Sequence, residues 1–387
     1  MKEAIYAASL DPITYGHKNL VERALKVFDR ILVAIGINEV KKPLFSLKER
    51  EAMARKELAE FGNKVQVMSF NGMLSDFAYE NNISTIIRGA RSTPDFDYEK
   101  LLGDINRYSG VDTIIYTSTP ELSHISSSAA KAITMNAGKN ILDYVSVDIK
   151  RRLEEELLHQ CRIGVTGMIG SGKSWIVDNF LSYITVSQIY SIECHSIDMD
   201  SIGHYILSTG KEPVYCEIRK EVNELINVKD TRKPIDIKKL RKVIFNNRDI
   251  RNYFDTIMLE PMMHELRKLL LEYRGTAERK SLVFVQGALL CEKEGLSEIN
   301  NNLVLVKCPG ATIRNRLKED RGYSDEVIES RMSSQMSFTD KALMAESVIK
   351  RANSGKIFVI ENDLQEFSGF NKSEDYESIL KYLGLRS

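Results

Sequence analysis

The sequence has no excess of charge of either sign. Lysine and arginine together number 54, as do aspartate and glutamate, so the formal net charge of the 387 residues is zero. This balance gives no reason to expect a nucleic-acid or anionic-membrane partner. No apolar run reaches the roughly 18 residues of a transmembrane helix, and the first residues enter a strand pattern directly. We therefore expect neither a membrane span nor an export signal.

The sequence also has few cysteines, and none are closely paired. The odd number and long gaps, without any C-x-x-C spacing, predict reduced thiols in the cytoplasm rather than disulfides. The five are Cys161, Cys194, Cys216, Cys291 and Cys308. Repeats, low-complexity tracts and long Pro/Gly/Ser linkers are lacking too. With 43% hydrophobic residues, the chain is long enough for two globular domains, or three.

Short apolar runs alternate with helical patterns through the first half. The runs expected as strands are 4–8, 31–37, 65–70, 85–87 and 113–116. This alternation predicts a doubly wound parallel sheet, in which ligands bind beyond the carboxyl ends of the strands. Residues 147–160 read as a charged helix that closes the first domain. We therefore expect domains over 1–158 and 159–387.

A glycine-rich loop opens the second half. The apolar run 161–166 leads into Gly-Met-Ile-Gly-Ser-Gly-Lys-Ser, which matches G-x-x-x-x-G-K-[ST] between a strand and a helix. Its amides cradle phosphates, its lysine reaches the β- and γ-phosphates, and its serine binds Mg²⁺. The residues expected at the nucleotide are Gly167, Gly170, Ser171, Gly172, Lys173, Ser174 and Trp175, the only tryptophan.

An acidic pair follows the next predicted strand, 191–197. Small-molecule kinases place a carboxylate there to accept the hydroxyl proton and help organise Mg²⁺, so we expect this of Asp198, with Asp200 beside it. A helix-capping aspartate is the alternative. The strand at 281–285 ends in glutamine and no N-K-x-D motif occurs, which argues against a GTPase. Arg316 and Arg321 lie in a basic segment expected to be a lid, or else a solvated charged helix.

Polar clusters also follow the predicted strands of the first half. Gly16 would let a phosphate approach the backbone, and His17 could donate to charge developing on a phosphoryl oxygen. Lys42 adds a cation after the second strand. The alternative for the histidine is plain helix capping.

Two further clusters carry the same kind of chemistry. Arg88 and Arg91 flank a glycine at a strand end and could clamp phosphates, although an exposed salt-bridged loop fits as well. Ser126, Ser127 and Ser128 open a helix and offer hydroxyls and amides to an anion, where ordinary N-capping would need only one of them.

Together these clusters resemble the phosphopantetheine adenylyltransferase family over about residues 1–145, with Ala7-Ala8 where the family usually has Pro-Gly. The resemblance implies attack of the 4′-phosphopantetheine phosphate on the α-phosphorus of ATP, giving dephospho-CoA and pyrophosphate. It implies transition-state stabilisation by His17, Lys42 and Arg91. It implies phosphopantetheine contacts from Ser9, Met73, Leu74, Arg88 and Asn106, and ATP contacts from Gly16, Glu99 and Ser126–Ser128.

Residues 161–365 resemble the dephospho-CoA kinase family in the P-loop, the Asp-Met-Asp and the lid. The resemblance implies that Asn353 and Gly355, matching N-x-G, lie near the adenine. His204, Glu260 and Ala288 depart from the Arg, His and Pro of that family, and Asp320-Arg321 reverses its usual order.

The sequence thus predicts an α/β protein with two domains: a Rossmann-like nucleotidyltransferase, then a P-loop kinase with a helical substrate region and a lid. The function expected is a bifunctional, cytoplasmic coenzyme A synthase that uses ATP and Mg²⁺. Its partners are the small molecules 4′-phosphopantetheine, dephospho-CoA and ATP, and a homo-oligomer through the first domain is expected, because the resembled adenylyltransferases form hexamers. Two alternatives stay open: a degenerate, regulatory kinase-like half, or a kinase half that acts on another small alcohol.

Overall fold

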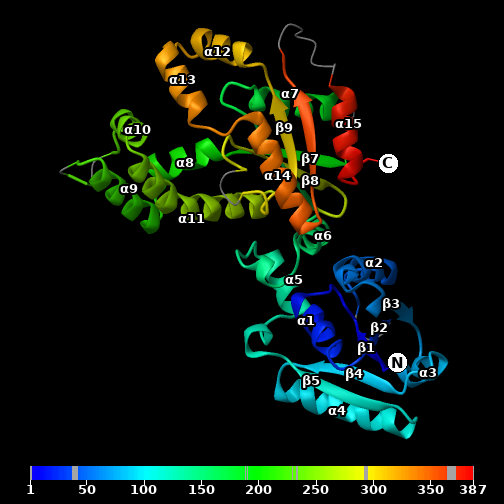
Figure 1. Cartoon of the computed structure of the whole chain (residues 1–387). Coiled ribbons are helices and arrows are strands. Elements are labelled where there is room, and N and C mark those ends of the chain that lie inside the picture. Colours follow the sequence, from blue (N-terminus) through cyan, green and yellow to red (C-terminus); the bar gives the residue numbers. More distant parts are fainter. Residues whose placement is uncertain are drawn as a thin grey trace. The chain divides into compact units, whose positions relative to one another are not determined.

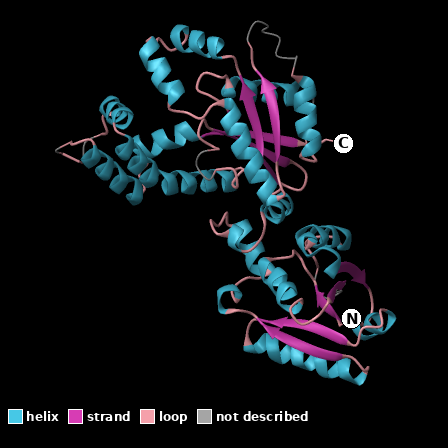
Figure 2. Ribbon diagram, in the orientation of Figure 1, coloured by secondary structure: helices cyan, strands magenta, loops and turns pink. Residues whose placement is uncertain are grey.

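The computed structural model describes residues 2–36, 42–187, 189, 191–228, 230–231, 234–291, 295–363 and 372–386. The chain divides into two compact units, Met1–Glu156 and Leu157–Ser387. Each unit contains a sheet of five parallel strands with helices around it (Figures 1 and 2). The predicted α/β fold is therefore confirmed. Among the described helices, none combines the length and apolar composition that crossing a membrane requires.

The sheet of the first unit has the strand order β3-β2-β1-β4-β5. Its strands are β1 Glu3–Ala8, β2 Arg30–Gly36, β3 Val65–Phe70, β4 Thr85–Ala90 and β5 Asp112–Thr117. The chain moves outward from β1 through β2 to β3, then returns to the other side of β1 at β4. The loops after β1 and β4 therefore diverge at the carboxyl edge, the usual place for a ligand in such sheets.

The helices of the first unit pack on both faces of this sheet. They are α1 Tyr15–Ala24, α2 Leu47–Glu57, α3 Leu74–Glu80, α4 Thr93–Tyr108, α5 Ser127–Met135 and α6 Val147–Leu157, with 3₁₀ turns at Ala59–Lys64, Pro120–Leu122 and Ile141–Asp143. Ser46 and Glu49 start α2 with reciprocal capping bonds. α6 is shorter than the predicted helix 147–160, because Gln160 already pairs with Ser281 in the second sheet.

The sheet of the second unit has the order β10-β9-β6-β8-β7, so the strand before the P-loop lies at its centre. The strands are β6 Gln160–Thr166, β7 Ile192–Asp198, β8 Lys280–Gln286, β9 Asn302–Lys307 and β10 Lys356–Glu361. Alternate residues of β8 serve two cores: Phe284 packs with Phe180 on one face, and Val283 with Leu266 on the other.

The helices of the second unit lie around its sheet. They are α7 Lys173–Val186, α8 Met199–Ser208, α9 Pro213–Leu225, α10 Ile237–Asn246, α11 Arg248–Glu272, α12 Gly310–Glu319, α13 Asp325–Ser333, α14 Phe338–Ala352 and α15 Ser373–Tyr382. Helices α8 to α11 gather beside the sheet at the left of Figure 1, whereas α12 and α13 form an arm above it. These groups occupy the places of the predicted substrate region and lid.

Candidate active sites

His17 is the third residue of α1 and bonds back to the residue that caps the helix. Its Nδ1 accepts the backbone N–H of Thr14 at 3.0 Å, and the Thr14 hydroxyl lies 2.9 Å from the same nitrogen. Since Nδ1 accepts, the proton of the neutral ring is inferred to be on Nε2. Burial, together with the positive charge of Arg91, lowers the pKa of His17 to about 4. His17 is therefore a neutral ring at pH 7 whose Nε2–H is a hydrogen-bond donor.

Gly16 leaves space beside the start of α1. A Cβ added there would meet no atom closer than 3.6 Å, and the residue has no positive φ. Neither the backbone conformation nor protein packing thus demands glycine. The room fits the approach of a ligand to the helix amino terminus.

Arg88 and Arg91 have different surroundings. The Arg88 guanidinium binds both carboxylate oxygens of Glu99, one at 3.0 Å, and donates to the Ala7 carbonyl at 2.8 Å. It is thereby fixed across β1, β4 and α4. Arg91 is exposed, 3.5 Å from the Asp95 carboxylate, and its charge reaches His17. Glu99 meets the site through Arg88.

The three serines at the start of α5 divide their roles. Ser126 caps the helix by accepting the Ala129 N–H at 3.0 Å, as the capping alternative expected. The Ser127 hydroxyl donates to the Pro12 carbonyl at 2.8 Å, which ties α5 to the loop after β1. Ser128 is exposed at the helix start. Two of the three hydroxyls are therefore already engaged in building the site.

The remaining predicted residues of the first unit do not all meet. Ser9 and Lys42 are exposed beyond the ends of β1 and β2. Met73, 55% exposed, and the half-buried Leu74 begin α3 beyond the end of β3. Residue 41, next to Lys42, lies outside the described residues.

Asn106 lies away from the phosphate loops. Its Nδ2 donates to the Thr113 hydroxyl at 3.2 Å, near the amino end of β5. α4 runs back along the sheet, so Asn106 is ~10 Å of helix beyond Glu99. Asn106 could therefore meet only a part of the substrate remote from its phosphate, and the implied contact with phosphopantetheine stays a prediction.

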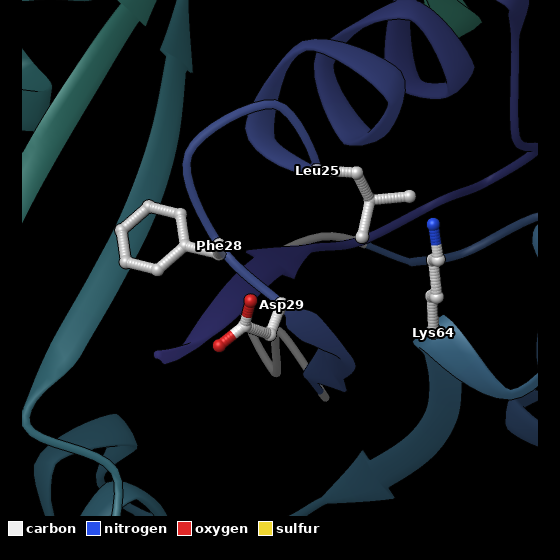
Figure 3. A pocket seen from close by; sticks show the side chains of 4 residues that line it. All are labelled: Leu25, Phe28, Asp29 and Lys64. Carbon is white, nitrogen blue, oxygen red and sulfur yellow. The ribbon is translucent and has the colours of Figure 1, made fainter. Parts of the chain in front are cut away.

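An open hollow in the first unit lies at the wrong edge for catalysis. Figure 3 shows it lined by Leu25, Phe28, Asp29 and Lys64. These residues precede β2 and β3, so the hollow lies at the amino edge of the sheet. The phosphate loops are at the carboxyl edge, where parallel sheets bind ligands. We assign the hollow no part in the reaction.

The P-loop of the second unit has the backbone that its glycines predict. Gly172 has φ +88°, and a Cβ there would come within 2.1 Å of the Asn362 side chain. The Lys173 ammonium donates to the carbonyls of Gly167 and Met168 at 3.4 and 3.2 Å. Burial lowers the pKa of Lys173 to about 8, helped by the charges of Lys341 and Arg321 and opposed by those of Asp200 and Asp198.

Asp198 and Asp200 lie at the end of β7 facing this lysine. Asp198 caps α8, accepting the Asp200 N–H at 3.0 Å and the Ser201 hydroxyl at 3.3 Å. Desolvation and the Asp198 charge raise the pKa of Asp200, against the opposing charges of Lys173, Arg321 and Arg331. Asp198 is thus a helix cap at the carboxyl end of β7, and its role as proton acceptor stays a prediction.

The two predicted lid arginines act at different places. Arg316 of α12 donates to the Gly170 carbonyl at 3.1 Å and to the Asn362 carbonyl at 3.2 Å, so it braces the P-loop itself. Arg321 is exposed between α12 and α13, and its charge bears on Lys173 and Asp200. Of the pair, Arg321 is the one open to a phosphate.

Asn353 and Gly355 are not at the nucleotide, and the expectation from N-x-G is corrected here. Asn353 ends α14 with φ +48°, and Gly355 has φ +109° with no room for a Cβ against Asn301. Both precede β10, whose six residues span about 20 Å, whereas the P-loop follows the carboxyl end of β6. The pattern marks a helix-ending turn. Asn362, beyond β10, instead donates to the Ser171 carbonyl at 2.8 Å.

Two other residues at this edge were missed by sequence reasoning. Gln335 accepts the Ile169 N–H of the P-loop at 2.9 Å. Lys341 of α14 is fully buried and donates to the Ala288 carbonyl at 2.6 Å. Because this contact uses the backbone of residue 288, the departure from proline does not remove it. Gln335 follows the basic lid segment in sequence, but an isolated lysine in a helical pattern gave no signal.

Comparison with known proteins agrees with the two sites. A cytidylyltransferase-like family model matches residues 5–133, and a dephospho-CoA kinase family model matches residues 161–357. A phosphopantetheine adenylyltransferase from Clostridium perfringens is 41% identical, covering 41% of this chain and 96% of its own. One from Buchnera aphidicola is 43% identical, covering 35% of this chain and 84% of its own. A solved structure, TT1252 from Thermus thermophilus, has a TM-score of 0.40 and 22% identity over 58% of this chain and 96% of its own.

Proposed function

The chain belongs to the phosphopantetheine adenylyltransferase family through its first half and to the dephospho-CoA kinase family through its second, and we propose that its two sheet edges catalyse successive reactions. It is a bifunctional enzyme of coenzyme A synthesis. The observation that supports two separate reactions is that each unit carries a phosphate-binding motif after a strand of its own parallel sheet. The dephospho-CoA made at the first site is the acceptor for the second. The functional boundary is proposed at 158/159.

At the first site, a phosphate oxygen of 4′-phosphopantetheine attacks the α-phosphorus of ATP. The bond from that phosphorus to the β-phosphate oxygen breaks, and pyrophosphate leaves. No base is needed, because the attacking phosphate is already an anion. The neutral His17 donates from Nε2 to the charge that develops on the α-phosphoryl group, and the cations of Lys42 and Arg91 stabilise it further.

The other residues of the first site hold the two substrates. Ser9, Met73, Leu74 and Arg88 bind phosphopantetheine; Gly16, Glu99 and Ser126–Ser128 bind ATP. The space at Gly16 and the exposure of Ser9 and Ser128 support these roles. The pairing of Arg88 with Glu99 joins the two substrate subsites into one rigid frame.

At the second site, the ribose 3′-hydroxyl of dephospho-CoA takes the γ-phosphoryl group of a second ATP. Asp198 accepts the hydroxyl proton, and ADP leaves. Lys173, with the amides of Gly167–Ser174, neutralises the phosphates, and Arg321 adds charge from the lid. Trp175, directly after Ser174, lies beside the nucleotide.

Magnesium fits the second site as a partner of ATP. The Ser174 hydroxyl and Asp198 carboxylate are oxygen ligands, which Mg²⁺ prefers, and both are exposed at the carboxyl edge. In the described part of the chain, no group of three or more His, Cys, Asp or Glu gathers as a metal cage. This suits an ion held mainly by phosphates and water. When bound, it would neutralise phosphate charge.

We also propose a cytoplasmic homo-oligomer joined through the first unit. Six large apolar side chains are exposed along α4 and β5, with Tyr108 95% exposed: Phe96, Tyr98, Leu101, Ile105, Tyr108 and Ile114. A patch of this kind is typical of a protein interface. All five cysteines are free, as expected for a reducing compartment.

The test follows both products over time in full-length enzyme supplied with phosphopantetheine, ATP and Mg²⁺. Dephospho-CoA should rise first and then convert to CoA. Lys173→Ala should stop at dephospho-CoA with normal pyrophosphate release. His17→Ala should abolish pyrophosphate release but still phosphorylate added dephospho-CoA. Loss of both activities in either folded variant would contradict independent sites.

A further inference from the structure

Asp11, in the loop after β1, is a buried carboxylate bound from three directions. Its side chain is part of a residue only 8% exposed. Oδ2 accepts the Leu44 N–H and Oδ1 the Phe45 N–H, each at 2.9 Å. The Lys131 ammonium lies 2.5 Å from Oδ2. One side chain therefore joins the loop after β1, the segment after β2 and helix α5.

The contact with α5 is reinforced next to Asp11. Ser127 lies one turn before Lys131, on the same face of α5, and its hydroxyl donates to the carbonyl of Pro12. Two successive residues of the loop, Asp11 and Pro12, are thus fastened to two successive turns of α5. These two bonds fix the position of the start of α5, with its exposed Ser128, relative to the loop that leads into α1.

The other end of the same loop is braced to β2. Arg50 of α2 is 3% exposed, and its Nη1 donates to the Ser9 carbonyl at 2.7 Å and to the Gly36 carbonyl at 3.2 Å. Asp11 in turn accepts the N–H of Leu44, two residues after Lys42. The described segment that starts at Lys42 is therefore attached to the loop after β1 by the bonds of Leu44 and Phe45 to Asp11.

From these contacts we propose that Asp11, paired with Lys131 of α5, is a positioning residue for adenylyl transfer, which acts by holding the segment that carries Lys42 beside the loop after β1. Only a carboxylate offers acceptors to all three donors, because the amide of asparagine has a single acceptor oxygen. Lys131 also cancels the charge of Asp11, so the pair does not repel an anionic substrate. The inference rests on the proposed function of the first unit.

The test is a double-mutant cycle between Asp11→Asn and Lys42→Ala in full-length enzyme, read as kcat and KM for pyrophosphate release. Asp11→Asn should lower kcat on the order of 100-fold, as expected when a reacting group is misplaced by about 1 Å. In the Lys42→Ala background the same change should cost less than about threefold. A residue needed only for stability would give multiplied losses, and that result would overturn the proposal.

Asp148→Asn is the matched control. Asp148 is also 8% exposed and bound by a lysine, Lys56 at 2.9 Å, but it lies on α6 outside the site. The kcat for adenylyl transfer of the Asp148→Asn enzyme should stay within about twofold of wild type. A loss of kcat equal to that of Asp11→Asn would overturn the proposal. If Asp11→Asn unfolds the first unit, Lys131→Met takes its place, with a smaller loss that again depends on Lys42.

The outcomes also separate this inference from the proposed function. Wild-type enzyme without pyrophosphate release would refute the adenylyl transfer itself. A Lys42→Ala variant of normal rate would refute the role of Lys42, and with it the route by which Asp11 acts. A slow Lys42→Ala variant whose loss multiplies with that of Asp11→Asn refutes only the positioning by Asp11.

Discussion

The side-chain oxygen of Gln335 accepts the backbone N–H of Ile169 across 2.9 Å. Gln335 follows α13, the second helix of the arm, whereas Ile169 lies in the P-loop, so the end of the predicted lid is tied to the P-loop. The sequence places these residues 166 positions apart. The contact makes the lid and the nucleotide loop parts of one hydrogen-bonded assembly.

We expect Gln335→Ala to slow phosphoryl transfer by roughly fivefold, since one ordinary hydrogen bond is worth ~1 kcal/mol. The measurement is ADP release with added dephospho-CoA. Ser333→Ala is the control, because its hydroxyl bonds only within its own helix, to the Ser330 carbonyl. Equal rates for the two variants would show that the Ile169 bond does not matter to transfer.

ATP binding to the second unit should weaken as the pH rises through 8. Lys173 has a pKa of about 8 in the free protein, so it is mostly protonated at pH 7 and mostly neutral at pH 9. Only the protonated form attracts the phosphates, so the dissociation constant should rise roughly tenfold between those pH values. Trp175 fluorescence reports the binding. Lys173→Arg, which stays charged, should give a flat profile, and a flat wild-type profile would be inconsistent with this pKa.

His17 should stay neutral far below the usual range for histidine. Its lowered pKa of about 4 predicts a neutral ring at pH 7 and no protonation near pH 6.5, and the Thr14 N–H bond to Nδ1 predicts the Nε2–H tautomer. The unfolded chain binds this proton at higher pH than the folded one, so His17 lowers the stability of the first unit as the pH falls from 6.5 toward 4. Imidazole ¹⁵N spectra, assigned with His17→Asn, check both points. A midpoint near 6.5 would exclude the proposed tautomeric donor at acid pH.

Asp198→Asn separates the two roles of Asp198. Asparagine caps helices as well as aspartate does, so α8 and the melting temperature should be preserved. The hydroxyl of dephospho-CoA loses its proton acceptor, so phosphoryl transfer should fall by about 10²-fold or more. Rates of ADP release, with thermal melting alongside, give the answer. Near-normal turnover would leave Asp198 as a cap alone.

A charge placed on α4 should break the proposed oligomer. Leu101 and Ile105 lie one turn apart and are 58% and 45% exposed. Leu101→Glu should reduce the mass measured by light scattering, because a buried carboxylate would be unpaired in the interface. Tyr79→Glu, at an 86% exposed position on α3, is the control. An unchanged mass for Leu101→Glu would place any self-association elsewhere.

The sequence predicted best what depends on local chemistry. The P-loop and the strands that precede each phosphate motif are set by residues a few positions apart. Prediction from the sequence failed where the position of a residue depends on packing between segments far apart in the chain. The pattern N-x-G predicted Asn353 near the adenine, but α14 continues to Ala352, so Asn353 lies before β10. The asparagine that bonds to the P-loop is Asn362, after β10.

Contacts between distant segments explain the remaining gaps. The burial of Lys341 beneath the loop after β8 and the three donors around Asp11 depend on helices that approach from far along the chain. The local pattern of residue types does not predict which distant segments come into contact. The role of Glu99 shows the same limit, because its partner Arg88 is reached only once α4 folds back over β4.

The register of β6 has a consequence for how the protein is made. Gln160 of β6 pairs with Ser281, and Gly164 with Leu303, so the central strand of the second sheet has neighbours only from much later in the chain. On the ribosome, the first unit can complete its five-stranded sheet once Thr117 has emerged. The newly made β6 is apolar, and it stays unpaired until β8 and β9 have been translated. In the nascent chain, the first unit should therefore be folded while the second unit is still unfolded. We expect chaperones to bind the second unit at this stage.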